Sequence, residues 1–364
     1  MFITGFIILV IIVSVNLFMQ TARFGALPSG ENLKKIQLSP RYQDGQFRNL
    51  SHTPQLTEGA NLFGVLKEFY FDKSKHKIPP APLPSVKTIL HGQDPGKNIL
   101  VWFGHSSYFM QVAGRTVLVD PVFSGNASPL RFTTKSFKGS DIYTVSDLPD
   151  IDYLFLTHDH WDHLDYRTIL ELKSKVKKVI TGFGVAAHLT LWGFNENLIV
   201  EMDWNDVFVP EPGFSVTSCP ARHFSGRSLK RNKSIWSSFV FSVPGKKIFF
   251  GGDSGYDSHF KDIGNQFGPF DLVILENGQY DKNWKYIHMN PAETVQAALD
   301  LQAKKLLPVH WGKFSLSVHS WNEPILRIVK EATKKNVTLI HPMIGELVDL
   351  DRDQVFSLWW ERIG

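Results

Sequence analysis

Short apolar runs, separated by glycine, proline and polar residues, recur along most of the chain. The runs over residues 98–103, 107–112 and 115–119 predict three strands, and Gly114 between the last two suits a hairpin turn. An apolar run at 151–156, a short one at 178–181, and several between residues 214 and 250 extend the strand pattern. These runs predict a chain rich in β-structure.

Helical patterns lie between the strand groups. Asp165 is placed to cap a helix over 166–175, and a second helix is expected over 185–192. Asn290 and Pro291 open a helix that runs to Gln302. Another helix is expected to start at Glu323 and to end near Lys334. The alternation of helices and strands by itself predicts a mixed α and β fold.

The first twenty residues form a separate apolar segment. Residues 2–19 carry no charge and are about long enough to span a bilayer, which predicts a transmembrane anchor over 1–20. A cleaved signal segment is the alternative, although no basic stretch precedes the apolar run and no small-residue cleavage site follows it. Basic residues follow the segment, which favours an anchor in the inner or plasma membrane with the remaining chain on the cytoplasmic side.

Residues 21–97 read as an N-terminal extension that packs on the larger unit formed by residues 98–364. The proline-rich run over 78–84 excludes a helix or a central strand there. A formal charge of +4 with both signs interspersed gives no indication of nucleic-acid binding. The single cysteine, Cys219, excludes a disulfide framework within the chain.

Potential metal ligands follow the apolar run at 151–156. Residues 158–163 read His-Asp-His-Trp-Asp-His, and imidazoles and carboxylates bind divalent cations such as zinc. Three further ligand types, His223, Asp253 and His310, each stand at the end of another apolar run. A lone histidine at a strand end is usually only a satisfied polar residue. The joint occurrence of all these residues predicts a metal site built on strand ends.

The order of these ligand residues resembles the metallo-β-lactamase superfamily, and within it the N-acyl-phosphatidylethanolamine-hydrolysing phospholipases D. The resemblance extends over residues 98–348 and rests on the stretches 102–106, 120–124, 157–165, 249–256, 267–271 and 309–312. It implies an α/β fold, the αββα four-layer sandwich, here with an N-terminal membrane segment. It also implies a phospholipid substrate, association with a membrane, and the capacity to form a homodimer.

The resemblance assigns a role to each ligand residue. One metal ion would be held by His158, His160 and His223, and a second by Asp162, His163 and His310. Asp253 would bridge the two, so Asp162 and Asp253 are expected to be catalytic. Two Zn²⁺ ions per chain are expected, with iron and manganese as open alternatives, and they would hold a bridging hydroxide.

Further residues are expected around the metals. Asp120 and Asp165 are candidates for hydrogen bonds to the metal-binding loops or to ligand imidazoles. The candidates for substrate contact are His105, Trp161, Tyr286 and His288. His288 would orient the phosphate or protonate the leaving group. Ile287 departs from the pattern, because the mammalian relatives have glutamine there.

A basic segment follows the third ligand histidine. It is either a solvated loop or a site that attracts phospholipid headgroups, and its members are Arg222, Arg227, Lys230, Arg231 and Lys233.

The resulting expectation is a zinc-dependent phosphodiesterase that converts N-acyl-phosphatidylethanolamine to phosphatidic acid and N-acylethanolamine. A lactonase or a phosphodiesterase acting on a soluble substrate is the alternative enzyme. A membrane-tethered envelope protein with a structural metal is the alternative outside enzymes.

Overall fold

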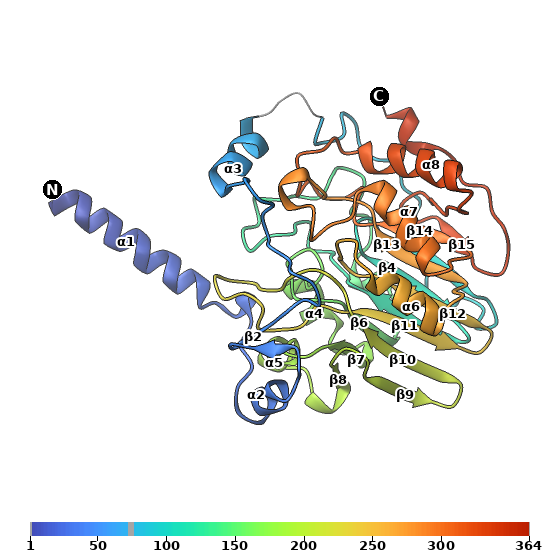
Figure 1. The fold of residues 1–364 in the computed structure, drawn as a ribbon, viewed down its shortest axis with the longest axis horizontal. Coiled ribbons are helices and arrows are strands. Elements are labelled where there is room, and N and C mark those ends of the chain that lie inside the picture. Colours follow the sequence, from blue (N-terminus) through green and yellow to red (C-terminus); the bar gives the residue numbers. More distant parts are fainter. Residues whose placement is uncertain (1, 72–75, 364) are drawn as a thin grey trace.

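Two mixed β-sheets form the centre of the computed structural model, which describes residues 2–71 and 76–363 (Figure 1). The seven-stranded sheet consists, in spatial order, of β15 (Leu347–Asp349), β3 (Ile99–Trp102), β4 (Tyr108–Val112), β5 (Arg115–Val119), β6 (Ile151–Leu156), β7 (Val176–Gly182) and β8 (Ile199–Met202). The six-stranded sheet consists of β14 (Leu306–Val309), β13 (Leu272–Glu276), β12 (Lys246–Phe250), β11 (Ser238–Val243), β10 (Phe214–Cys219) and β9 (Val207–Glu211).

Aromatic side chains fill the space between the sheets. Phe155 of β6 packs edge-on against Phe250 of β12, with ring centroids 4.9 Å apart, and against Phe239 and Phe241 of β11 at 5.5 Å. All four side chains are fully buried. Such aromatic pairs bury large apolar areas and constrain the geometry of the contact. The shared aromatic core therefore fixes how the strand ends of one sheet lie relative to those of the other.

Helices cover the outer face of each sheet. Helices α4 (Tyr166–Leu172) and α5 (Ala186–Leu191) pack their apolar residues against the seven-stranded sheet. Helices α6 (His259–Phe267), α7 (Pro291–Asp300) and α8 (Glu323–Lys335) cover the six-stranded sheet. The layers run helix, sheet, sheet, helix, as expected for the αββα sandwich.

The starts of the predicted helices agree with the structure to within one residue, whereas some ends differ. The side chain of Asn290 caps α7 by accepting hydrogen bonds from the backbone N–H groups of Ala292 and Glu293. Helix α4 begins at Tyr166 as expected but ends at Leu172, three residues before the predicted end. The backbone N–H of Lys175 bonds to Leu172 O in a tight turn, and Val176 already begins β7.

The N-terminal extension contains more regular structure than the sequence predicts. It includes α2 (Gly30–Gln37), the hairpin of β1 (Tyr42–Gln43) and β2 (Gln46–Phe47), and α3 (Leu62–Phe71). Backbone hydrogen bonds join it to the main body, from Phe47 N to Asn232 O and from Leu83 N to Lys138 O. The proline-rich run over 78–84 contains neither helix nor strand.

The chain begins with α1 (Phe2–Met19), which projects from the body and leaves most of its apolar side chains exposed (Figure 1). Within residues 2–71 and 76–363, no helix meets the combined length and apolarity needed to cross a membrane. The predicted membrane-spanning segment over residues 2–19 is therefore not confirmed.

Candidate metal centre

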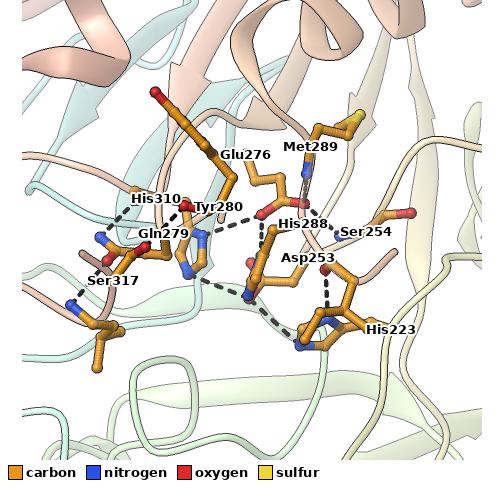
Figure 2. Close-up of polar contacts among 12 residues, drawn as sticks. His223, Asp253, Ser254, Glu276, Gln279, Tyr280, His288, Met289, His310 and Ser317 are labelled. Atoms are coloured by element: carbon orange, nitrogen blue, oxygen red, sulfur yellow. Dashed lines mark hydrogen bonds and ion pairs between the residues drawn. The ribbon is translucent and has the colours of Figure 1, made fainter. Parts of the chain in front are cut away.

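All the predicted metal ligands meet at one edge of the sandwich. His158, His160, Asp162 and His163 lie on the loop that leaves β6 and leads into α4. His223 follows β10, Asp253 follows β12, and His310 immediately follows β14, all in the other sheet. Figure 2 shows His223, Asp253 and His310 converging from these separate segments. One sheet thus contributes four of the candidate ligands and the other sheet three.

Three imidazole nitrogens form the first group. His160 Nδ1 lies 2.9 Å from His158 Nε2 and 3.2 Å from His223 Nε2. Ligand nitrogens on a tetrahedral zinc stand about 3.3 Å apart, since each Zn–N bond is about 2.0–2.1 Å. The spacing of these three nitrogens therefore fits a single metal ion.

The second group contains Asp162, His163 and His310. Asp162 Oδ2 lies 3.3 Å from His310 Nε2 and 3.5 Å from His163 Nε2. Asp253 Oδ2 lies 3.2 Å from His163 Nε2 and 3.3 Å from His310 Nε2. The same oxygen is 3.9 Å from His158 Nε2 and 3.8 Å from His223 Nε2. Asp253 therefore stands between the two groups, where a bridging carboxylate is expected.

Burial and protonation of these residues fit metal binding. His163 Nε2, which belongs to the second group, is buried and has no hydrogen-bond partner among the described residues, which is costly unless a cation or another polar group satisfies it. Burial lowers the pKa of His160 to about 4 and holds the pKa values of His158 and His223 well below the usual range. These three imidazoles are therefore neutral at pH 7, as metal ligands must be.

The second group has the opposite electrostatic character. Burial favours the neutral form of His310, but Asp253, Asp162 and Glu276 outweigh it and raise its pKa to about 10. The carboxylates likewise raise the pKa of His163 well above its usual value, against the effect of burial. The second group therefore concentrates negative charge, and a divalent cation can neutralise this charge in place of protons. The residues thus fit a metal pair.

Asp120 holds one of the ligands, as predicted from the sequence. Its carboxylate lies 2.8 Å from His163 Nδ1 and accepts hydrogen bonds from the backbone N–H and the hydroxyl of Thr157, at 2.9 and 2.6 Å. A carboxylate on the outer nitrogen of a ligand histidine fixes the orientation of the ring and its tautomer. Asp120 therefore anchors the start of the ligand loop and His163 together.

Asp165 has a different role from Asp120. Its side chain caps α4 by accepting from Arg167 N, and it accepts from Ser124 N at 3.0 Å and from the Thr168 hydroxyl at 2.5 Å. It therefore fixes the end of the ligand loop through the helix start and contacts no ligand imidazole within the described residues.

Glu276 is a functional candidate that the sequence analysis did not identify. Its fully buried carboxylate accepts from Ser254 N and Met289 N through Oε1, while Oε2 lies 2.5 Å from His288 Nδ1 and 3.2 Å from His310 Nδ1 (Figure 2). One carboxylate thus orients a metal ligand and His288. Glu276 ends the apolar strand β13, so the rule that located Asp253 and His310 could have found it.

His223 is held by two segments outside its own loop. Its Nδ1 lies 2.8 Å from the carbonyl of Ile287, which leaves Nε2 for the metal group. The side chain of Asn49, in the N-terminal extension, donates to His223 O at 2.7 Å and accepts from His223 N at 3.1 Å. Asn49 was not singled out in the sequence, where nothing connects it to a residue so distant along the chain.

A cavity of about 1230 Å³ opens onto the metal groups. Trp161 and His288, two of the residues predicted to contact substrate, line this cavity, and so does Ile287. The rest of the wall is largely apolar, with contributions from Phe18, Phe24, Leu62, Val65, Leu66, Phe69, Leu130, Leu229 and Leu316.

Two other predicted substrate residues lie elsewhere. His105 is fully buried, and its Nε2 lies 2.9 Å from Asp162 Oδ2, so it orients a metal ligand rather than contacting substrate. Burial lowers the pKa of His105 to about 3, so the ring stays neutral. Tyr286 packs under the guanidinium of Arg222, with its hydroxyl near Glu58, and does not line the cavity.

The basic segment is only partly available to a ligand. Arg227 is buried, Arg222 bonds to Thr53 and to the carbonyls of His52 and Tyr256, and the Lys233 amine bonds to Gly45 O. Lys230 and Arg231 are exposed. Tertiary contacts therefore engage three of the five basic residues, and both readings of the segment rest on Lys230 and Arg231.

Comparison with known proteins agrees with this geometry. Residues 115–311 match the β-lactamase superfamily domain. An uncharacterized protein of Mycobacterium tuberculosis is 36% identical over 326 residues, which is 88% of this chain and 87% of that protein. N-acyl-phosphatidylethanolamine-hydrolyzing phospholipase D 1 of Caenorhabditis elegans is 31% identical over 268 residues, which is 64% of this chain and 72% of that protein.

A solved structure shares the fold. Igni18, a metallo hydrolase from the archaeon Ignicoccus hospitalis, superposes with a TM-score of 0.55 at 20% identity, over 69% of this chain and 97% of that one. The ligand clusters, the domain match and the relatives together identify a metal-dependent hydrolase. The chain belongs to the metallo-β-lactamase superfamily and lies close to its N-acyl-phosphatidylethanolamine-hydrolysing phospholipases D.

Proposed function

We propose that this chain is a phosphodiesterase that uses two zinc ions to hydrolyse phospholipids of the N-acyl-phosphatidylethanolamine type. The products would be phosphatidic acid and an N-acylethanolamine. The observation that carries the proposal is the large, mainly apolar cavity with the metal groups on its wall. The phospholipase relatives support the choice of substrate class.

The cavity matches the two chemical parts of such a lipid. Its apolar wall, formed in part by Phe69 of α3 and Phe18 of α1, suits acyl chains. The metal ligands His160, Asp162 and His310 line the same cavity, where a phosphate would lie. A substrate with one charged group and long chains satisfies both surfaces at once.

Each of the two ligand groups would hold one metal ion. His158, His160 and His223 would bind one cation, and Asp162, His163 and His310 the other, with Asp253 between them. When bound, a pair of divalent cations supplies Lewis-acid activation of water and of the phosphoryl oxygens. Asp120, His105 and Glu276 would hold the ligands in position through their outer contacts.

His288 is suited to protonate the leaving group. Its Nδ1 contact with Glu276 fixes the ring and leaves Nε2 as the nitrogen available to the cavity. The ring centroid of His288 lies 5.0 Å from that of His223 and 5.1 Å from that of His310. As the bond between phosphorus and the ethanolamine oxygen breaks, a proton on Nε2 would pass to that oxygen.

Apolar groups around the cavity would bring the chain to a lipid surface. Helix α3 has no buried side chain, and its Phe63 and Tyr70 are 79% and 70% exposed. Leu229 is 84% exposed and stands next to the exposed Lys230 and Arg231. Apolar side chains mixed with cations suit an anionic membrane surface.

The test is hydrolysis of N-acyl-phosphatidylethanolamine in mixed micelles by the zinc-loaded full chain, with the metal content measured in parallel. Bis-p-nitrophenyl phosphate and an acyl lactone serve as comparison substrates, and Asp253→Asn as the inactive control. We expect release of N-acylethanolamine by the wild-type chain only. Turnover of the soluble ester or the lactone without turnover of the lipid would refute the proposed substrate while leaving the metal-dependent hydrolase intact.

A further inference from the structure

The segment directly after α1 crosses the loop that carries four of the metal ligands. We call residues 22–26 the N-terminal arm; its first residues form the short helix η1 (Ala22–Phe24). The arm is held through its backbone. Ala22 O accepts from Trp192 Nε1 at 2.6 Å, Arg23 O accepts from Arg227, and Ala26 N donates to His188 Nδ1 at 3.1 Å. Such contacts fix the path of the chain rather than particular side chains.

Arg227 connects the arm to the ligand loop. Its Nε and Nη2 donate to Arg23 O at 3.1 and 2.9 Å, and its Nη1 donates to Asp159 O at 2.9 Å and to Leu164 O at 2.7 Å. Asp159 and Leu164 lie near the two ends of the ligand loop. A single guanidinium therefore ties both ends of that loop to the arm.

The guanidinium of Arg227 is almost completely buried, with 4% exposure, and lies 3.9 Å from the ring centre of Trp161 and 5.3 Å from that of Trp192. Burial lowers the pKa of Arg227 to about 10, so the group remains charged at pH 7. A buried charge is tolerated only when its hydrogen-bonding groups are satisfied. Loss of Arg23 O as a partner would leave two buried donors unpaired, so the position of the arm and that of the loop depend on each other.

A second connection runs through Asp159, which lies between the ligands His158 and His160. Its buried carboxylate accepts from Gly226 N at 2.6 Å and from the Ser234 hydroxyl at 2.9 Å, and it lies 3.2 Å from His188 Nε2. Because His188 Nδ1 accepts from Ala26 N, one imidazole bridges the arm and the ligand loop. The arm thus reaches the loop by two independent routes.

The arm also forms part of the cavity wall. The ring of Phe24 meets that of Trp161 edge-on at 5.2 Å, and both residues line the cavity. Trp161 stands between the ligands His160 and Asp162 in the sequence. Displacement of the arm would therefore remove a wall of the cavity as well as the support of the loop.

We propose that the N-terminal arm is part of the active site. The arm holds the ligand loop in its metal-binding geometry through Arg227 and the Asp159–His188 pair. Arg227 and His188 are then positioning residues. The inference rests on the metal-dependent hydrolysis proposed above, but not on the identity of the lipid. Outer contacts of metal ligands typically contribute about 10–100-fold in metal affinity, which sets the expected effect.

Two glycines with positive φ provide a variant and its control. Gly25 has a φ of 76°, and a Cβ there would lie 1.9 Å from His188 Nδ1. Gly30 has a φ of 56°, and a Cβ there would meet nothing within 4 Å. Gly25 also has a ψ of −163°, in a region that is essentially restricted to glycine, so alanine there strains the backbone of the arm in addition to meeting His188. Gly30→Ala controls for a positive φ near the arm without a steric contact. Only Gly25→Ala must also move the arm or the His188 ring, and either movement breaks the connection to Asp159.

The experiment compares the wild-type full-length chain with Gly25→Ala and Gly30→Ala. The cobalt-substituted proteins are titrated with a competing chelator while the cobalt absorption bands are recorded, and amide exchange is followed in peptides that cover residues 158–165. We expect Gly25→Ala to lose about 10–100-fold in metal affinity. Exchange in 158–165 should accelerate, and the peptides around Asp253 and His310 should change less. Gly30→Ala should match the wild type.

Metal saturation separates a positioning role from general destabilisation. With excess metal, Gly25→Ala should recover the wild-type kcat on bis-p-nitrophenyl phosphate, because the ligands themselves are unchanged. If Gly25→Ala does not accumulate as folded protein, Arg227→Lys tests the same connection, since the ammonium keeps the charge but has three N–H donors on one nitrogen for the four hydrogen bonds that Arg227 makes. Wild-type metal affinity and loop exchange in the variant examined would overturn the proposal. These readouts do not require lipid turnover, so failure of the lipid substrate would leave this test intact.

Discussion

The two halves of the metal centre are built in different ways. The seven-stranded sheet contributes His158, His160, Asp162 and His163 from one continuous loop, whereas the six-stranded sheet contributes His223, Asp253 and His310 from the ends of three separate strands. A loop has no sheet hydrogen bonds of its own to fix its shape, and here buried charged groups do so, namely Asp120, Asp159 and Arg227. His310 directly follows β14 and Asp253 stands three residues after β12, so the hydrogen bonds of the sheet restrict the positions of these two ligands. We therefore expect the loop half to depend more strongly on its surroundings.

The largest effect is expected at Asp253, which lies between the two metal groups. Asp253→Asn removes the negative charge of a carboxylate whose Oδ2 atom lies within 3.9 Å of ligand nitrogens in both metal groups. We expect metal content to fall from two ions per chain and turnover to drop by about 10³-fold or more, with the fold retained. Metal analysis and steady-state kinetics on bis-p-nitrophenyl phosphate measure both effects. Full turnover by the variant would refute the bridging assignment.

Two carboxylates of the loop half allow a sharper test. Asp120→Asn weakens the contact with His163, and we expect metal affinity to fall about 10–100-fold. Asp165→Asn is the matched control, because Asp165 caps α4 and contacts no ligand imidazole among the described residues. It should cost about 1 kcal/mol or less of stability and leave metal affinity unchanged. Chelator competition and thermal unfolding separate the two outcomes; equal losses of affinity would show that any change in the loop disturbs the metals.

In the strand-end half, Glu276→Gln is expected to act on turnover more than on metal binding. The amide keeps one oxygen acceptor, so His310 remains ligated, but the negative charge beside His288 is lost. We expect kcat to fall about 10–100-fold, the range typical of general acid–base groups or below it, with near-normal metal content. Glu293→Gln serves as the control, since Glu293 only caps α7. Loss of metal with unchanged kcat at saturation would make Glu276 purely structural.

Removal of metal should affect the two halves unequally. A ligand present at about a thousand times its dissociation constant contributes about 4 kcal/mol to folding stability, so treatment with a chelator should lower the melting temperature by about 5 °C or more. Amide exchange should increase more in residues 158–165 than in the strands that end at Cys219, Phe250 and Val309. Equal protection in both regions would refute the proposed difference between loop and strand ends.

The smallest effect is expected for the two exposed basic residues, Lys230 and Arg231. Lys230→Glu combined with Arg231→Glu reverses the exposed charges of the basic segment, whereas Arg222 is engaged in internal contacts. We expect weaker sedimentation with anionic vesicles, by about 1 kcal/mol for each charge near the surface, and unchanged metal content. Binding to vesicles that does not change would remove the headgroup role of this segment.

The sequence located the metal centre because its ligands occur in recognisable local contexts. Each ligand follows an apolar run that ends at the edge of a sheet, and the spacing within 158–163 needs no knowledge of distant contacts. The same reasoning could not predict which side chains of His105, Tyr286 and the basic segment are available to a ligand, because that depends on their exposure in the folded chain. Neighbours that lie far away in the chain bury Arg227 and His105 and occupy Arg222.

The sequence by itself determined the alternation of strands and helices, the candidate metal ligands and the family, because these depend on local periodicity and on a short motif. Only the tertiary structure decided which side chains support the ligands. Asn49 reaches His223, Glu276 reaches His288 and His310, and Arg227 joins the arm to the ligand loop. These contacts form when the aromatic core aligns the two sheets, which brings together segments separated by up to two hundred residues. No local pattern encodes such proximity, so it becomes visible only in the folded chain.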